Sequence, residues 1–223
     1  MKLAQLVLDG VFPPTCIGCS GEGDWLCLGC VKTVPLIEDA FIPAESSVKR
    51  ILAISSYQDP LVGGLIRSLK YQRAVCLEDE ALRAVLQRFA SEIDFLSTLQ
   101  ASPTMIVPLA MDPERERVRG IDHALHIARL IQSVLFPEIP VVQALVRTKT
   151  VRANATLGSL EERKANVQDV FACSVDVEGQ SILLVDDVYT TGATMTEAAT
   201  LLERYGAALV QGCVLARSGP ASG

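Results

Sequence analysis

Short apolar runs alternate with amphipathic stretches along most of the chain. Runs rich in Val, Ile and Leu are typical of strands, whereas apolar residues spaced three and four apart are typical of helices. Strands are predicted at residues 51–57, 104–109, 141–146, 170–177, 181–188 and 208–216. Helices are predicted at residues 61–70, 78–99, 121–136 and 194–205. This alternation predicts an α/β fold with a parallel sheet, right-handed crossovers and helices on both faces.

Two of the predicted helices have well-marked apolar faces. In the helix over 78–99, the residues predicted to face inward are Ala81, Leu82, Val85, Phe89, Ile93 and Leu96. In the helix over 194–205, the residues that keep helical spacing are Met195, Ala198, Ala199, Leu202 and Tyr205. Gly206 follows at the position where a left-handed cap would end this second helix.

The first 47 residues differ in pattern from the rest of the chain. Residues 1–11 place four apolar side chains on one helical face and lack the continuous apolar segment of a signal peptide, so we expect an amphipathic helix. Residues 12–47 are rich in proline and cysteine and short of periodic pattern. We therefore predict an N-terminal helix with a small metal-binding module over 1–47, followed by the main domain over 48–223.

Four of the seven cysteines form two Cys-x-x-Cys pairs, Cys16 with Cys19 and Cys27 with Cys30. Four thiolates at this spacing suit tetrahedral Zn²⁺, and such a full site is structural because it leaves no position for water or substrate. Disulfides or free core cysteines are the alternatives, but nothing in the sequence indicates an oxidising compartment. The cysteines predicted to be buried apolar residues instead are Cys76, Cys173 and Cys213.

Composition and charge narrow the classes of protein further. A chain of 223 residues with 49% hydrophobic content can bury a sizeable core, as one main domain with a small appendage. Its net charge of -6 argues against broad attraction to nucleic acid or anionic lipid. No apolar run approaches the ~20 residues of a membrane span. We therefore expect a cytoplasmic globular protein.

Residues 181–195 carry the strongest chemical signal. Asp186 and Asp187 follow an apolar run and are expected at the carboxyl end of a strand, the edge where parallel sheets bind ligands. Two carboxylates there can accept hydrogen bonds from adjacent hydroxyls or hold Mg²⁺ through water. Residues 190–194 supply hydroxyls, a glycine and the N–H groups of a starting helix, which suit a phosphate. The segment therefore predicts a sugar-phosphate site, with an ordinary strand end and helix cap as the alternative.

This segment resembles the phosphoribosyl pyrophosphate (PRPP) loop of type I phosphoribosyltransferases, in which two acids follow an apolar strand and precede Thr-Thr-Gly-Ser/Ala-Thr. The resemblance implies that Asp186 and Asp187 bind the 2′ and 3′ hydroxyls of the ribose. It further implies that the turn after them holds the 5′-phosphate. The residues of this turn are Tyr189, Thr190, Thr191, Gly192, Ala193 and Thr194.

Two cationic segments occur where this class of enzyme uses them. Arg115, Arg117 and Arg119 follow the predicted strand 104–109, and the corresponding loop of type I enzymes holds pyrophosphate, which the guanidinium fork suits. A solvated charged turn is the alternative, because two glutamates are interleaved. Residues 148–166 resemble the hood loop that closes over PRPP, with a basic connector as the alternative. His123, near the start of the next helix, is predicted to be a surface or capping residue.

The order of the motifs narrows the resemblance to ComF-like proteins over nearly the whole chain. In sequence order these are the paired cysteines, Ile106-Val-Pro-Leu109, Arg117-Val-Arg-Gly-Ile-Asp-His-Ala124, Arg163-Lys-Ala-Asn166 and the PRPP loop. The family usually has Arg-Gly-Phe-Asn-Gln where this chain has Arg119-Gly-Ile-Asp-His123. The resemblance implies Lys70 and Arg163 as further site cations, although Lys70 could equally compensate the dipole at a helix end.

The ComF resemblance implies PRPP binding with Mg²⁺, a structural Zn²⁺ and a link to DNA uptake in natural transformation. One hypothesis is a phosphoribosyltransferase, in which Asp186 and Asp187 orient the ribose while an acceptor displaces pyrophosphate. The other is a protein without transferase activity that senses PRPP or binds single-stranded DNA. The expected partners are thus PRPP or ribose 5-phosphate, with single-stranded DNA and DNA-uptake proteins as further candidates. No segment dictates an acceptor base or an oligomeric state.

Overall fold

The computed structural model describes residues 15–24, 26–38, 40–41, 43, 46–71, 75–111, 122–148 and 170–219, with backbone alone at 70–71 and 75–78. The predicted N-terminal helix therefore lies outside the described residues, as do the arginine-bearing loop and nearly all of the segment 148–166.

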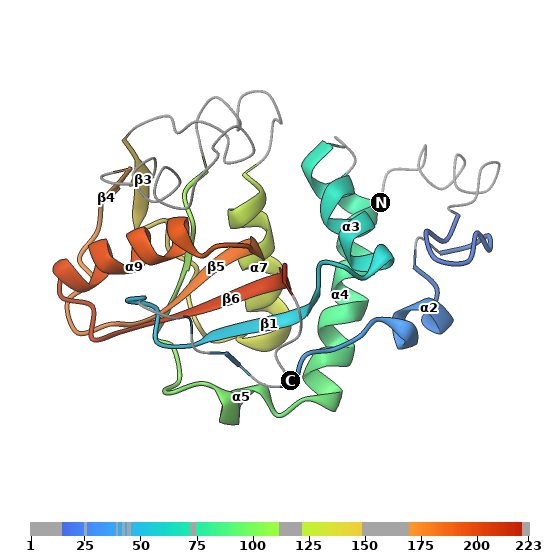
Figure 1. Cartoon of the computed structure of the whole chain (residues 1–223), viewed down its shortest axis with the longest axis horizontal. Helices are drawn as coiled ribbons and strands as arrows, with labels where there is room; N and C mark the ends of the chain where they lie inside the picture. Colours follow the sequence, from blue (N-terminus) through green and yellow to red (C-terminus); the bar gives the residue numbers. More distant parts are fainter. Residues whose placement is uncertain are drawn as a thin grey trace.

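Four parallel strands form the central sheet in the order β1-β6-β5-β2 (Figure 1). Their bounds are β1 Ile51–Ser56, β2 Met105–Pro108, β5 Ser181–Tyr189 and β6 Leu209–Arg217. In β5, the side chains from Ile182 to Val185 are completely buried, because helices cover both faces of the sheet. The predicted α/β fold with a parallel sheet is confirmed.

The helices divide between the two faces of the sheet. One face is covered by α3 (Pro60–Tyr71), α4 (Val75–Glu92) and α7 (His123–Leu135). The short α5 (Phe95–Thr98) adds Phe95 to the same core. The opposite face is covered by α9 (Ala193–Arg204), so Figure 1 shows α9 and α7 on either side of the strands. The result is a three-layer arrangement in which the strand ends are left free to carry loops.

Two predicted strands take a different place from the one expected. Within 141–146, Val141 makes one parallel bridge to Ile106, and the regular strand β3 begins only at Leu145 and ends at Arg147. The predicted strand 170–177 shortens to β4 (Phe171–Cys173), which pairs with β3 in a separate antiparallel sheet. The parallel position predicted for 141–146 is confirmed at Val141 alone, and that predicted for 170–177 was wrong, because an apolar run does not specify its partner strand.

The predicted helix over 78–99 is interrupted, and this changes one of its inward residues. The chain leaves the helix after Glu92 and starts α5 at Phe95. The change of direction buries Phe95 and leaves Leu96 55% exposed. Ala81, Leu82, Val85 and Phe89 are buried as predicted, and Ile93 packs partly buried against them. The assignment of Leu96 to the core was therefore wrong.

The end of α9 follows the predicted glycine cap closely. Gly206 has a left-handed φ of 90°. Its N–H donates to the carbonyl of Glu203 at 3.0 Å, and the N–H of Ala207 donates to Leu202 at 3.0 Å. This pair of bonds is the Schellman arrangement. Because the helix ends at Arg204, Tyr205 is not part of its buried face and is 52% exposed, although it keeps the helical spacing of the apolar residues before it.

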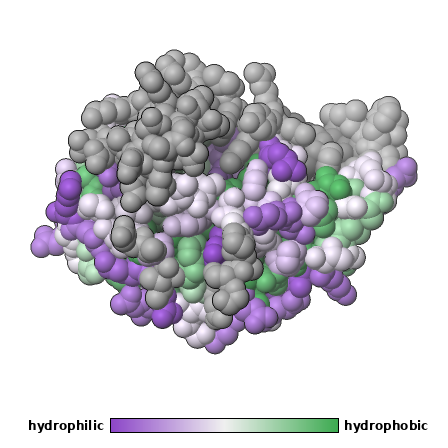
Figure 2. Space-filling model, viewed as in Figure 1, coloured by the Kyte–Doolittle hydropathy of each residue, from purple (hydrophilic) through white to green (hydrophobic). Residues whose placement is uncertain are grey.

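The N-terminal module shares its core with the main domain. Its helix α2 (Leu28–Thr33) lies beside α4, and the buried Cys16, Leu26, Val31 and Val34 belong to the hydrophobic cluster of α3 and α4. On the face drawn in Figure 2, hydrophobic residues appear in separate patches among hydrophilic ones, including some on the side of this module. Within the described residues, no helix is long and apolar enough to cross a membrane.

Candidate ligand site and metal centre

The helices that follow β2 and β5 along the chain lie on opposite faces of the sheet. The chain after β2 leads to α7 on the face of α3 and α4, whereas β5 leads directly into α9 on the other face. β2 and β5 are neighbours in the sheet, with Val107 opposite Leu184. Their carboxyl ends therefore border a topological switch point, the place where open α/β sheets bind ligands.

The acidic pair lies at this switch point. Asp186 and Asp187 are half-buried residues in the last part of β5, and Asp186 is opposite Val214 of β6. The Asp186 carboxylate accepts a hydrogen bond from the Asp187 backbone N–H at 2.8 Å. Two carboxylates at one strand end suit adjacent ribose hydroxyls or a hydrated Mg²⁺. The ribose role of this pair stays a prediction.

The turn after the acidic pair has the backbone conformation that a phosphate cradle requires. Thr190 and Thr191 are exposed, and Gly192 is the N-cap of α9 with φ 74° and ψ −2°. Gly192 has no side chain to occupy the N–H groups of the first helical turn, which leaves them available to an anion. Ala193 and Thr194 begin the helix and are half-buried.

The Tyr189 ring packs directly beneath Gly192. A Cβ placed on Gly192 would lie 2.6 Å from Tyr189 Cζ and 2.7 Å from Cε2, and closer still to the hydroxyl. Burial raises the pKa of Tyr189, and the positive charge of Arg217 partly opposes the shift. The turn thus needs glycine for two independent reasons, its left-handed backbone and the ring below it.

A cavity of about 290 Å³ lies beside the carboxyl end of β2. Its walls come from the end of β2, the start of α7 and the strand β3. Arg147 contributes a cation there, and its guanidinium lies 5.5 Å from the centre of the Phe171 ring. Asp122 also lines the cavity while capping α7 through the Leu125 N–H at 3.0 Å. The full lining is Pro108, Ala110, Met111, Asp122, Gln143, Leu145, Val146 and Arg147.

The remaining predicted site cations are placed only in part. Lys70 lies in the last turn of α3, in the chain segment that follows the carboxyl end of β1. The residues that lie outside the described part of the chain are Arg115, Arg117, Arg119 and Arg163. Their binding of pyrophosphate stays a prediction. His123 is 5% exposed, so its assignment to the surface was wrong.

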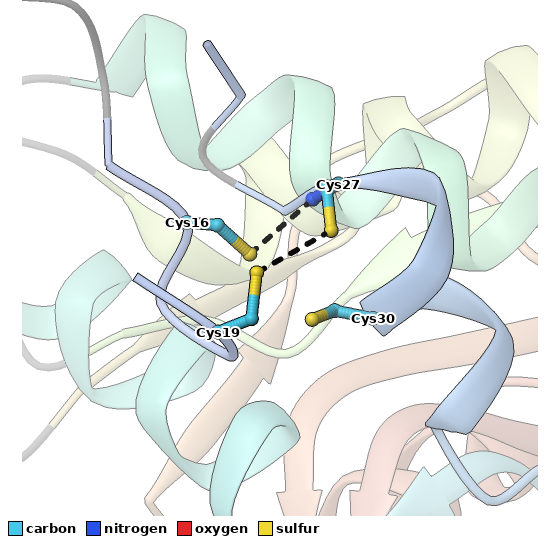
Figure 3. A group of neighbouring side chains, drawn as sticks. All are labelled: Cys16, Cys19, Cys27 and Cys30. Carbon is cyan, nitrogen blue, oxygen red and sulfur yellow. Dashed lines mark hydrogen bonds between the residues drawn. The ribbon is translucent and has the colours of Figure 1, made fainter. Parts of the chain in front are cut away.

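The four N-terminal cysteines point toward one another (Figure 3). Cys16 and Cys19 come from a loop, whereas Cys27 and Cys30 come from the start of α2. All four sulfurs lie within 4.8 Å of one another, and those of Cys19 and Cys27 are 3.7 Å apart. Neighbouring sulfurs around a tetrahedral Zn²⁺ would be about 3.8 Å apart at ordinary Zn–S distances. The cluster can therefore bind a metal ion such as zinc.

The pKa values of Cys16 and Cys30 are shifted in opposite directions. The Cys27 backbone N–H donates to Cys16 Sγ at 3.4 Å, and this bond above all lowers the pKa of Cys16 to about 6. Hydrogen bonding to the Cys27 side chain is the main reason that the pKa of Cys30 rises to about 12. A metal must displace the protons that remain, so metal affinity falls as the pH is lowered.

Arg88 of α4 links the N-terminal module to the main domain through hydrogen bonds. Its Nη1 donates to the carbonyls of Val31 at 2.9 Å and Val34 at 2.7 Å, at the end of α2. Its Nε and Nη2 donate to both carboxylate oxygens of Glu92, at 2.9 and 3.0 Å, and this contact lowers the Glu92 pKa. A cation here satisfies carbonyls that a helix end leaves unpaired.

The cysteines outside the cluster behave differently from its members. Cys213 is completely buried in β6, and burial raises its pKa to about 12. Cys173 is half-buried and donates to the Val175 carbonyl at 3.3 Å. The side chain of Cys76 lies outside the described residues. The prediction of a buried, small apolar residue is confirmed for Cys213.

Residues 77–222 match the phosphoribosyl transferase domain family, and the chain therefore belongs to this family. Within it, the chain is a ComF-like protein related to competence and DNA utilization proteins. The DNA utilization protein YhgH of Salmonella typhi is 32% identical over 172 residues, which cover 76% of this chain and 73% of YhgH. Competence protein F of Haemophilus influenzae is 27% identical over 227 residues, which cover 91% of this chain and 96% of that protein.

Among solved structures, the chain matches part of the glutamine PRPP amidotransferase of B. subtilis. It is 18% identical, with a TM-score of 0.42, and the match covers 67% of this chain. The chain spans only 30% of that structure's length. The family assignment rests on the sequence match over residues 77–222.

Proposed function

We propose that this protein binds PRPP with Mg²⁺ at the carboxyl ends of β2 and β5. The observation that carries the proposal is the junction of β5 and α9, where Asp186 and Asp187 precede a left-handed Gly192 at a topological switch point. A ribose requires paired acceptors and a 5′-phosphate requires exposed N–H groups, and both lie within one short segment. Membership of the phosphoribosyl transferase domain family agrees with this ligand.

If the protein is a transferase, an acceptor displaces pyrophosphate from C1 of the ribose. Asp186 and Asp187 would hold the ribose and position C1, and the turn at Gly192 would fix the 5′-phosphate. Mg²⁺ would neutralise charge on the departing pyrophosphate. The cavity beside β2 has about the size of a small-molecule site and contains the polar side chains of Gln143 and Arg147, which favours it as the acceptor pocket.

A second candidate function is PRPP sensing without transfer, in a protein that also contacts single-stranded DNA or the DNA-uptake machinery. The names of the relatives favour it, since they describe DNA utilization and competence. The net charge of -6 means that any DNA contact would need a local basic surface.

Pyrophosphate release separates the two functions. Purified protein with PRPP and Mg²⁺ would be challenged with nucleobases and, separately, with single-stranded DNA. Release that depends on a particular base would establish a transferase. Saturable PRPP binding with no release for any acceptor, together with DNA binding, would establish the sensing function.

We further propose that the four-cysteine cluster holds a structural Zn²⁺. The four sulfurs leave no open position for a substrate, and the module containing them shares the core of α3 and α4. Gly18 packs closely between the cysteine cluster and α3. A Cβ added to it would be 2.7 Å from Cys30 Sγ and 2.9 Å from Leu61 Cδ2. The metal would thus fix the loop that packs on α3.

The purified chain is expected to contain one zinc per molecule, and Cys16→Ser to remove it. Loss of the metal should unfold the module, because binding supplies much of the folding free energy of such small sites. Elemental analysis and thermal melting of anaerobically purified protein measure both effects. Cys173→Ser is the matched control and should keep the metal, since Cys173 lies outside the cluster. Unchanged zinc content and melting in Cys16→Ser would contradict the proposal.

A further inference from the structure

The linker, meaning the described residues between α2 and β1, contacts Tyr189 at the start of the candidate phosphate turn. Phe41 forms an isolated antiparallel bridge with Ile51 of β1, with its N–H donating at 3.0 Å and its carbonyl accepting at 2.8 Å. This bridge fixes the backbone of Phe41 against the sheet. Its ring meets the Tyr189 ring at an angle of 71°, with the ring centres 5.0 Å apart. This edge-to-face geometry is favourable for aromatic pairs.

Arg217 completes the group from the end of β6. It lies opposite both Tyr189 of β5 and Ser56 of β1, at the carboxyl edge of the sheet. Its guanidinium carbon is 4.5 Å from the centre of the Phe41 ring. The next residue, Ser218, donates its N–H to the Tyr189 carbonyl at 2.8 Å. The Phe41 ring thus contacts both a cation and the Tyr189 ring.

The Tyr189 ring also lies against Gly192, where an added Cβ would overlap its Cζ and Cε2 atoms. The contacts therefore run from Phe41 to Tyr189 and from Tyr189 to the N-cap of α9. The linker is also joined to α9 itself, since Ser46 and Thr196 hydroxyls are 2.8 Å apart and those of Ser47 and Thr200 are 2.9 Å apart. The linker and the phosphate turn thus share one packed unit.

We infer that Phe41 is a positioning residue of the phosphate turn, which acts through the Tyr189 ring to hold Gly192 in its left-handed conformation. This inference rests on the proposed PRPP function for its ligand. Phe41 contacts the turn through the ring of its first residue, Tyr189, and is assigned no direct contact with phosphate. Its loss should let the Tyr189 ring move and the N–H groups of the turn lose their alignment, with weaker binding of a 5′-phosphate as the consequence.

The test compares Phe41→Leu with Phe41→Tyr, which keeps the aromatic ring. Phe41→Leu should weaken ribose 5-phosphate binding about twofold to tenfold, the range expected for loss of one aromatic pair, and leave pyrophosphate binding unchanged. Phe41→Tyr should bind both ligands as the natural chain does. Arg217 is a poorer choice for substitution, because removing its charge would weaken any anion directly.

Phe136→Leu is the matched control. Phe136 forms a comparable edge-to-face pair with Phe95, 5.5 Å between ring centres, at the end of α7 away from the turn. This variant should lose stability but keep ribose 5-phosphate affinity. An equal loss of affinity in Phe136→Leu and Phe41→Leu would overturn the inference, as would unchanged affinity in Phe41→Leu.

Hydrogen exchange makes the inference testable without any ligand. In Phe41→Leu the amides of residues 190–194 should exchange faster than in the natural chain, whereas in Phe136→Leu they should not. If the natural chain bound no ribose 5-phosphate, the proposed function would fail, yet the exchange comparison would still decide whether Phe41 positions the turn. Unchanged exchange at 190–194 in Phe41→Leu would refute it.

Discussion

Gly192→Val is expected to abolish binding of both PRPP and ribose 5-phosphate. Gly192 has φ 74°, a region that β-branched residues strongly disfavour, and its missing Cβ leaves the space that the Tyr189 ring occupies. Valine would have to move either the turn or the ring, and both changes displace the N–H groups from a phosphate. We expect affinity to fall by about 100-fold or more, the equivalent of about 3 kcal/mol. Calorimetric titration of each ligand measures the loss.

Gly179→Val separates this effect from general backbone strain. Gly179 has nearly the same φ, 70°, but an added Cβ would meet no atom within 4 Å, and it precedes β5 at the opposite edge of the sheet. It should cost about 1–2 kcal/mol of stability and leave ligand affinity unchanged. If Gly192→Val kept ribose 5-phosphate affinity, or if both variants lost it equally, the phosphate would not be bound at this turn.

Replacing Asp186 and Asp187 together by asparagine is expected to remove Mg²⁺-dependent PRPP binding without unfolding the protein. Two half-buried carboxylates side by side at one strand end repel each other, so removing their charge should leave the stability equal or higher. Asparagine keeps the shape but is a poorer acceptor for ribose hydroxyls and a weaker ligand for Mg²⁺. PRPP affinity should drop at least ~10-fold, the equivalent of ~1.4 kcal/mol. Thermal melting and PRPP titration report the two effects.

The matched control removes the same charge from the other edge of the sheet. Asp176→Asn with Glu178→Gln changes two exposed carboxylates in the turn before β5. Because the net charge of the two double variants is identical, a general electrostatic effect would appear in both. PRPP affinity should be lost only with Asp186 and Asp187. An unchanged affinity in that variant would remove the ribose role from the acidic pair.

The parallel sheet could be predicted from sequence because burial on both faces produces continuous apolar runs. Ile182 to Val185 is such a run, and all four side chains are completely buried. The same pattern does not specify which strand pairs with which. For that reason Leu145 and Phe171 were placed in the main sheet, although they belong to the small antiparallel pair. Leu96 was misplaced because helical spacing alone does not reveal a helix end at Glu92.

The candidate site shows a similar division between local and distant contacts. The acidic pair, Gly192 and the four cysteines lie in short contiguous motifs, so their chemistry is visible in the sequence. Phe41 and Arg217 are far from these motifs, and only the pairing of β1, β5 and β6 brings them to Tyr189. Arg217 could have been suspected as a cation at the end of a predicted strand, whereas no pattern around Phe41 indicated its contact.

The N-terminal module and the candidate ligand site are connected by contacts at either end of the linker. Arg88 fastens α2 to α4 at one end, and Phe41 contacts Tyr189 at the other. A structural metal would therefore stabilise the N-terminal module, from which the linker extends. The four-cysteine site has no open position for substrate. This arrangement would nevertheless connect it physically to the phosphate turn.

Calorimetric titration of the zinc-loaded protein with PRPP, in the presence and absence of Mg²⁺, tests the proposed ligand most directly. The structure of the β5–α9 junction leads us to expect one PRPP bound per chain, with affinity that rises when Mg²⁺ is added. A folded, zinc-loaded protein that shows no saturable PRPP binding with Mg²⁺ would contradict the proposed function.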